Sequence, residues 1–211
     1  MKYNTIVFDC DGVILDSNNI KTTAFRKTLS SFDKKFIDEF IQYHTSHAGI
    51  SRYKKIDYFF NSIIIKEYSK DEYDDLIHTF HKTVIEQLTK CQTTNGVIDY
   101  LNSISKTPKI IVSGGDQNEL RQVFKCRLLD HHFNNIFGSP DTKIDIISRE
   151  INQSKIKGPY LYFGDSQHDY EVATHFNMDF IFVSDYTEFD HWQSFCDAKA
   201  IKTIPNFNYL K

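Results

Sequence analysis

Residues 8–17 of the chain read FDCDGVILDS, and the apolar run Thr5–Phe8 leads into them. A short β-branched and aromatic run that ends abruptly in acids and glycine is typical of a buried strand that gives way to a turn. Residues two apart in an extended segment point to the same side, so Asp9 and Asp11 would face one pocket. Two carboxylates this close repel each other, and a bound cation or a raised pKa must reconcile them.

Three further apolar runs have the same form, and each is followed by Gly, Ser or Asp; they lie at Lys109–Val112, Tyr160–Phe163 and Phe180–Val183. Strands that are apolar on both faces belong to parallel sheets with helices between them. Helical patterns follow the later runs at Asp116–Leu129, Thr142–Ile156 and Asp169–Phe176, with a brief strand pattern at Asn134–Gly138. The sequence therefore predicts an α/β fold with a doubly wound parallel sheet.

The interval between the first and second apolar runs spans about ninety residues, far more than one crossover helix requires. It carries helical patterns at Ser17–Ser30, Lys34–His44, Ile50–Ile65 and Asp71–Leu88, and a further one at Thr94–Ile104 that would return the chain to the sheet. We therefore predict an α/β core made of residues 1–16 and 89–211, interrupted by an inserted helical subdomain at residues 17–88.

Composition excludes several classes of protein. The chain has 211 residues, a net charge of −3 and 40% apolar residues, which is ordinary for a globular protein and unlike disordered, collagen-like or coiled-coil chains. A nearly neutral chain has no general attraction to nucleic acid. The four cysteines form no CxxC pair, and no apolar run approaches a signal-peptide core or a membrane span. We expect a cytoplasmic protein with reduced thiols and without nucleic-acid or membrane partners.

Acidic residues also follow the third apolar run, at Asp165 and Asp169. Ligands of parallel α/β sheets bind beyond the carboxyl ends of the strands, so Asp9, Asp11, Asp165 and Asp169 would converge there if their strands are neighbours. A cluster of carboxylates suits a hard cation such as Mg²⁺, which prefers oxygen ligands. For one such motif alone, the alternative is a plain strand-to-turn exit, because Asp and Gly favour turns.

Four motifs in this order resemble those of the haloacid dehalogenase superfamily. Residues 8–17 meet every fixed position of its first motif, DxDGxxxDS, and residues 164–169 meet its fourth, GDxxxD. The second motif, an apolar strand ending in Ser or Thr, is similar to residues 110–114, and Lys143 is the candidate for the lysine of the third. The resemblance implies a Rossmann-like core, in the branch of phosphoglycolate phosphatases and β-phosphoglucomutases.

The resemblance also implies roles for the four acids. Asp9 would be the nucleophile that forms an aspartyl-phosphate, and Asp11 would be the general acid and then the general base. Asp9, the main-chain carbonyl of Asp11 and Asp165 would hold Mg²⁺, and Asp169 would be a further ligand or an acceptor behind the metal. An acid at the position of Asp11 is absent from the dehalogenase, phosphonatase and P-type ATPase branches, which disfavours those reactions.

The second and third motifs would bind the phosphate. By the same resemblance, Ser113 and the main-chain N–H of Gly114 would bind phosphate oxygens, and Lys143 would neutralise Asp9 and the transferring phosphoryl group. Mg²⁺ and a lysine are the minimum needed to overcome the repulsion between a phosphate and several carboxylates. Taken alone, the serine and glycine are also consistent with a simple turn, and the lysine with a solvated helix start.

The predicted insert resembles the superfamily's helical cap, which closes over the site and selects the substrate. The segment His47–Lys55 is similar to its substrate-specificity loop, in which Gly49 would allow a tight backbone. We expect Arg52 or Lys55 to reach an anionic or hydroxyl group at the far end of the substrate, because a guanidinium suits carboxylates and phosphates. The alternative is a solvated basic helix start.

Together these inferences predict a Mg²⁺-dependent phosphoric monoester hydrolase, acting on a sugar phosphate or a phosphoglycolate-like metabolite, as a monomer or homodimer. Two alternatives stay open at this point. A phosphomutase of the β-phosphoglucomutase type would use the same chemistry but protect its aspartyl-phosphate from water. A non-catalytic binding protein could also use the same fold, because fold does not fix function.

Overall fold

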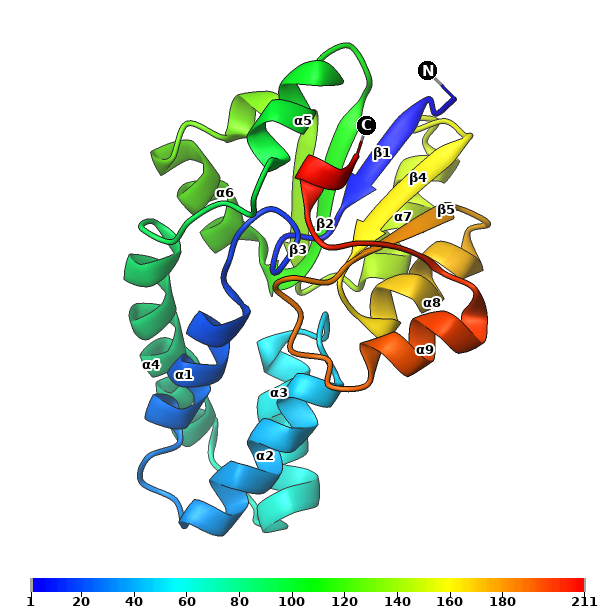
Figure 1. Cartoon of the computed structure of the whole chain (residues 1–211). Coiled ribbons are helices and arrows are strands. Elements are labelled where there is room, and N and C mark those ends of the chain that lie inside the picture. The colour runs from blue at the N-terminus through cyan, green and yellow to red at the C-terminus, as the bar shows by residue number, and fades with distance from the viewer. Residues whose placement is uncertain (1, 211) are drawn as a thin grey trace.

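The computed structural model describes residues 2–210, and its centre is a six-stranded parallel sheet (Figure 1). The strands are β1 (Thr5–Phe8), β2 (Lys109–Asp116), β3 (Asn135–Ser139), β4 (Tyr160–Gly164), β5 (Asp179–Val183) and β6 (Lys202–Ile204). Their order is β3-β2-β1-β4-β5-β6, and every neighbouring pair is parallel. The chain winds outward from β1 through β2 to β3, then returns to place β4 on the other side of β1. The doubly wound α/β fold is confirmed.

Helices cover both faces of this sheet because alternate residues of the central strands point to opposite sides. Ile6 and Phe8 of β1 face a core shared with α5 (Val97–Ser103) and α6 (Gln117–Cys126). Val7 faces the opposite core, which is shared with α7 (Lys143–Asn152) and α8 (Gln167–His175). The chain also forms α9 (Trp192–Lys199) and two 3₁₀ turns, at Asp130–His132 and Phe207–Tyr209. Burial on both faces explains why the strands read as continuous apolar runs.

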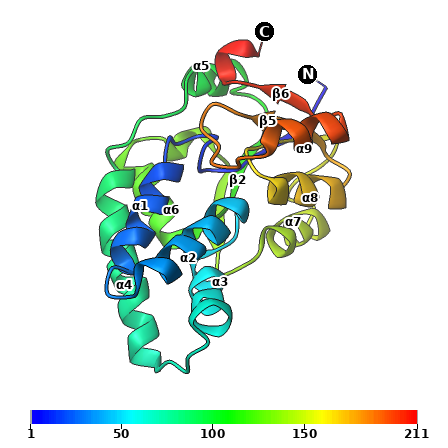
Figure 2. The ribbon, with the colours of Figure 1, turned by 60° about the horizontal axis from the view of Figure 1, so that its bottom comes forward.

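A separate group of helices lies beyond the carboxyl ends of the strands, as Figures 1 and 2 show. It consists of α1 (Asn18–Thr28), α2 (Lys34–Ser46), α3 (Arg52–Tyr58), a π-helical turn (Phe59–Ile64) and α4 (Lys70–Leu88). Packing between aromatic side chains holds it together. The ring centroid of Phe25 lies 5.0 Å from that of Phe40 and 4.1 Å from that of Phe80. These helices occupy the predicted insert, whose limits at residues 17 and 88 stay a prediction.

The segments that enter and leave this helical group run side by side. Leu15 and Thr93 form an antiparallel bridge, and Asp16 N–H donates to Gln92 O at 3.0 Å. Thr94 N–H donates to Ile14 O at 3.0 Å. The two connections therefore form one paired stem, directly after the acidic residues that follow β1.

The structure differs from the predicted elements in two places. The single helix predicted at Ile50–Ile65 is wrong in its second half, where α3 widens into the π-helical turn and ends at Ile65 with a φ of 48°. That turn brings two adjacent rings, Phe59 and Phe60, into the core, where both are fully buried. The prediction also lacked α9 and β6.

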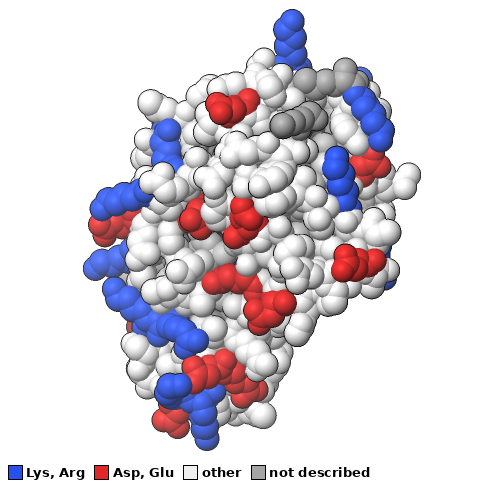
Figure 3. Space-filling model, in the orientation of Figure 1, with Lys and Arg blue, Asp and Glu red and all other residues white. Residues whose placement is uncertain are grey.

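Acidic and basic side chains occupy different parts of the face of the molecule drawn in Figure 3. Figure 3 shows acidic side chains near the middle of one face and lysines and arginines mainly toward its edges. Among residues 2–210, no helix combines the length and the apolar character that crossing a membrane requires.

Candidate active site

Asp9 is the first residue after β1 and lies at the middle of the carboxyl edge of the sheet. Its main-chain N–H donates to Phe163 O of β4 at 2.9 Å, which fixes the end of β1 against its neighbour. Its side chain is only 4% exposed. The winding of the chain reverses at this edge, between β1 and β4, and ligands of open α/β sheets bind at such points.

Lys143 begins α7 and joins two of the acids. Its Nζ donates to Asp9 Oδ1 at 2.7 Å and to Asp169 Oδ1 at 2.6 Å. Asp169 also accepts hydrogen bonds from Tyr162 Oη at 2.9 Å and from Ser166 Oγ at 2.5 Å. Burial opposes the charge of Lys143, but the carboxylates outweigh it and raise the lysine's pKa well above its ordinary value. Asp169 therefore holds a charged Lys143 against Asp9.

Three buried carboxylates, those of Asp9, Asp165 and Asp169, place oxygen atoms within 4.8 Å of one another. Burial raises the pKa of Asp9 to about 7 despite Lys143, and burial beside the charge of Asp9 raises that of Asp165 well above its ordinary value. The cluster thus holds three carboxylates against the single ammonium of Lys143. A divalent cation would balance this excess, and oxygen-only donors fit Mg²⁺.

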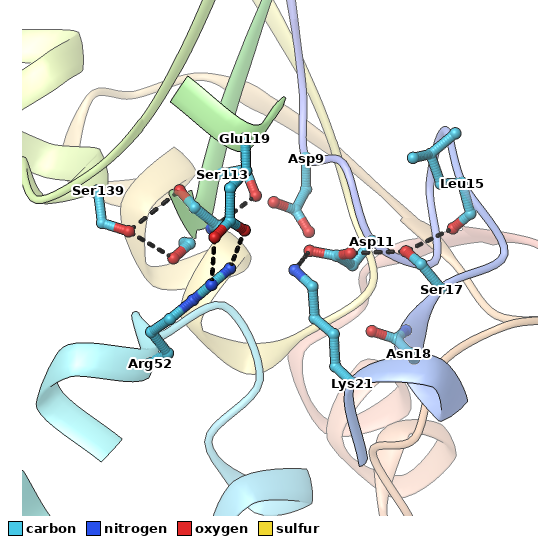
Figure 4. A network of polar contacts seen from close by, with 12 residues as sticks. Asp9, Asp11, Leu15, Ser17, Asn18, Lys21, Arg52, Ser113, Glu119 and Ser139 are labelled. Atoms are coloured by element: carbon cyan, nitrogen blue, oxygen red, sulfur yellow. Dashed lines mark hydrogen bonds and ion pairs between the residues drawn. The ribbon is translucent and has the colours of Figure 1, made fainter. Parts of the chain in front are cut away.

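Asp11 lies at the mouth of the same site, and Figure 4 shows its side chain between those of Asp9, Ser17 and Lys21. Asp11 accepts a hydrogen bond from Ser17 Oγ at 2.6 Å and forms an ion pair with Lys21 of α1. Burial raises the pKa of Asp11, but Lys21 and Ser17 outweigh it and the net pKa lies below the ordinary value. The next residue, Gly12, has a φ of 72°, and a Cβ there would lie 2.2 Å from Asp165 Oδ2. Only glycine fits this turn.

The end of β2 provides a cradle beside Asp9. Ser113 is fully buried, and its Oγ accepts a hydrogen bond from Gly115 N–H at 3.0 Å. Ser139 Oγ contacts the carbonyls of Gly114 and Gly115 at 2.8 and 3.0 Å, which braces this turn (Figure 4). Gly114 lies so close to the helical group that an added Cβ would meet Gly49 O at 2.2 Å. The loop before α3 is therefore packed directly on the cradle.

Arg52, from the start of α3, is brought to the site but is already paired. Its guanidinium forms two hydrogen bonds with Glu119 of α6, at 2.6 and 2.5 Å, and lies 4.6 Å from the ring centroid of Phe80. His81 Nδ1 of α4 contacts the same carboxylate. Figure 4 shows Arg52 rising from α3 toward Glu119. The carboxylate of Glu119, on a helix that packs against the sheet, thus contacts both α3 and α4 of the helical group.

Lys55, one turn further along α3, is 2% exposed. Its Nζ lies 2.6 Å from His44 Nδ1 and 3.1 Å from His44 O, both on α2. A cavity separates this end of the helical group from the sheet edge. The charged side chains that line it are Asp9, Asp11, Lys21, Arg52, Lys55, Asp165 and Glu188.

The structure thus brings together all of the residues proposed from the sequence. Lys143 contacts Asp9 and Asp169, and oxygen atoms of Asp9, Asp165 and Asp169 lie within 4.8 Å of one another. The cavity is lined by Asp11, Gly49, Arg52, Lys55 and Gly114. Ser113 lines a second pocket, to which Gly49 and Gly114 also belong. Sequence reasoning missed Lys21 and Glu119. Lys21 stands one helical turn after Ser17, which is a signal that could have placed it near the first motif. Glu119 gives no such signal, because its partner lies 67 residues away.

Comparisons with known proteins bear on the family and the fold of this chain. A family model described as haloacid dehalogenase-like hydrolase matches residues 6–183. No curated protein matches the chain by sequence.

Solved structures share the fold over nearly the whole chain. A predicted phosphatase from Clostridium acetobutylicum has a TM-score of 0.76 at 17% identity, covering 100% of this chain and 97% of that one. A predicted phosphoglycolate phosphatase from Haemophilus somnus has a TM-score of 0.75 at 16% identity, covering 100% and 97%. A β-phosphoglucomutase from Clostridium difficile has a TM-score of 0.74 at 17% identity, covering 99% and 93%. At these identities the likeness concerns the fold.

Proposed function

Since this chain belongs to the haloacid dehalogenase-like hydrolase family, we propose that it is a Mg²⁺-dependent phosphatase acting on a small phosphorylated metabolite. The observation that carries the proposal is the hydrogen bonding of the two carboxylate oxygens of Asp9. One of its oxygens is held by Lys143, and among residues 2–210 the other, Oδ2, makes no hydrogen bond. A carboxylate oxygen that is fixed in place but uncommitted is what attack on phosphorus requires.

In the proposed reaction, Asp9 Oδ2 forms a bond to phosphorus and the bond to the ester oxygen breaks, while Asp11 gives that oxygen its proton. Asp11 then takes a proton from water, and this water attacks the phosphorus of the aspartyl-phosphate to release phosphate and restore Asp9. The lowered pKa of Asp11 suits the second step. The first step needs Asp11 protonated, which withdrawal of Lys21 would favour because their ion pair stabilises the carboxylate.

The acidic cluster supplies the metal site of this proposal. Asp9, Asp165 and the main-chain carbonyl of Asp11 would hold Mg²⁺, with Asp169 as a further ligand or as the anchor of Lys143. When bound, the ion offsets the repulsion between the carboxylates and the incoming phosphate. Lys143, Ser113 and the Gly114 N–H then orient the phosphoryl group in front of Asp9.

The test is hydrolysis of p-nitrophenyl phosphate with Mg²⁺ and with EDTA, followed by a panel of sugar phosphates, phosphoglycolate and nucleotides. We expect Mg²⁺-dependent phosphate release that Asp9→Asn abolishes. Asp38→Asn is the matched control, because it removes the same charge from an exposed ion pair with Arg26 and Lys34. Activity that survives Asp9→Asn would refute the role of Asp9 as the nucleophile. Isomerisation of a sugar phosphate without phosphate release would show a mutase instead.

A further inference from the structure

Three cationic side chains of the helical group line the cavity opposite Asp9: Lys21, Arg52 and Lys55. Each could bind a second negative charge at the far end of a substrate. Whether it does depends on what the protein itself places beside it, because a paired cation has little attraction left for a further anion.

Of the three cations, Arg52 is best suited to bind such a charge, but it also has the most complete ion pair within the protein. Glu119 takes both of its terminal nitrogens, in the parallel two-bond geometry that a carboxylate ligand would need. The two side chains are only 4% and 7% exposed, so water screens the pair little. A substrate carboxylate would have to displace Glu119 to reach the guanidinium.

The other two cations also have partners within the protein. Lys21 is paired with Asp11. Lys55 directs its Nζ at the ring and carbonyl of His44, and the carboxylate of Glu188 lines the same cavity. Glu188 Oε2 accepts a hydrogen bond from Thr22, and among residues 2–210 its Oε1 makes no hydrogen bond. Two of the three cations are therefore held in ion pairs, and the third is held by His44.

We propose that Glu119 is a specificity-determining residue: by neutralising Arg52, it makes the enzyme favour monoesters whose far end carries hydroxyl groups over those with a second carboxylate or phosphate. This inference rests on the proposed phosphatase function. The polar groups that remain available at this end are a Lys55 N–H donor and Glu188 acceptors. Hydroxyl groups both donate and accept, so they complement this set.

Substrate pairs that differ only at the far end test the inference. Suitable pairs are 2-hydroxyethyl phosphate with 2-phosphoglycolate, erythritol 4-phosphate with 4-phosphoerythronate, and glucitol 6-phosphate with 6-phosphogluconate. In each pair a hydroxymethyl group replaces a carboxylate. The readout is the ratio of kcat/KM for the acid to kcat/KM for the alcohol, since damage to the fold lowers both values together and leaves their ratio unchanged.

We expect the wild-type ratio to lie below one for the pair that is turned over best. Glu119→Gln should raise that ratio about tenfold, mainly through KM, because the freed guanidinium gains a charge-assisted bond to the acid. Adding Arg52→Met to Glu119→Gln should remove the gain. Glu86→Gln is the control, since it removes the same charge from an exposed ion pair with Lys90.

Two results would overturn the inference while leaving the phosphatase intact. One is a wild-type preference for the acids that Arg52→Met abolishes. The other is a Glu119→Gln variant that loses activity on both members of a pair with an unchanged ratio. If Glu119→Gln does not fold, the double variant Arg52→Met/Glu119→Gln decides alone, because it removes both charges of the buried pair: it should leave the wild-type ratio unaltered, and a fall of that ratio would overturn the inference. An enzyme that hydrolyses no monoester would fail the proposed function first, and this inference with it.

Discussion

The contact between Gly114 and Gly49 allows a test of whether the helical group must pack closely on the phosphate cradle. In Gly114→Ala, the added Cβ would lie 2.2 Å from Gly49 O and 2.8 Å from Gly49 C. Both are main-chain atoms, so no side-chain rotation can relieve the clash. The carbonyl would have to retreat by about 1.2 Å, from 2.2 Å to the 3.4 Å at which ordinary contact begins. All the groups named in the proposed reaction would still be present.

A displacement of about 1 Å at a site can cost on the order of 100-fold in rate, or about 2.7 kcal/mol of transition-state stabilisation. We therefore expect kcat/KM of Gly114→Ala for p-nitrophenyl phosphate to fall by about that factor. The free energy of unfolding should change little, since the loop can shift and alanine restricts the unfolded chain, which is worth about 0.4–1 kcal/mol. Urea denaturation measures this second quantity.

Gly115→Ala is the matched control, because its added Cβ would lie 3.4 Å from the side chain of Leu120, which is ordinary contact. It should keep nearly the wild-type kcat/KM. The reasoning is refuted if Gly114→Ala retains wild-type activity, or if the two variants lose activity equally.

Three further predictions concern the charges of the site. Lys143→Met should lower the free energy of unfolding of the metal-free protein by about 3–5 kcal/mol in urea denaturation, because it leaves Asp9 and Asp169 buried without their counter-charge; an unchanged midpoint would contradict the pairing. Mg²⁺ at about 100 times its dissociation constant should stabilise the EDTA-treated chain by about 2.7 kcal/mol, and no shift of the melting temperature would exclude the metal site. Burial, with Lys21 nearby, lowers the pKa of Lys55 to about 7 from 10.5, so the folded chain binds fewer protons than the unfolded chain between these values and its stability should rise with pH across them. Lys55→Met should flatten that rise between pH 7 and 9.5, and a slope equal to that of the wild type would show that burial does not lower the pKa of Lys55.

Local sequence patterns predicted the sheet because its strands bury both faces. The runs Thr5–Phe8, Tyr160–Phe163 and Phe180–Val183 are apolar at nearly every position, and each forms a strand within a residue of its expected bounds. Strand β6 escaped prediction because two of its three residues, Lys202 and Thr203, are exposed at the edge of the sheet. This edge strand therefore has no apolar run to detect.

The site was predictable only where residues near in sequence also act together. Asp9 and Asp11 stand two apart after one strand, and the spacing of Asp165 and Asp169 fits one motif. The pairing of Arg52 with Glu119 depends on how α3 packs on α6, and neither residue's neighbourhood in the sequence carries that information. The sequence alone therefore predicted a free Arg52 or Lys55 facing the substrate, whereas the structure gives both residues internal partners.

The paired stem at residues 13–16 and 92–94 has an evolutionary consequence. Because the chain leaves and rejoins the sheet at one point, a different module could be spliced in there without changing strand order or register. Such an exchange would leave Asp9, Lys143, Asp165 and Asp169 in place, because all four lie outside the segment between the two sides of the stem.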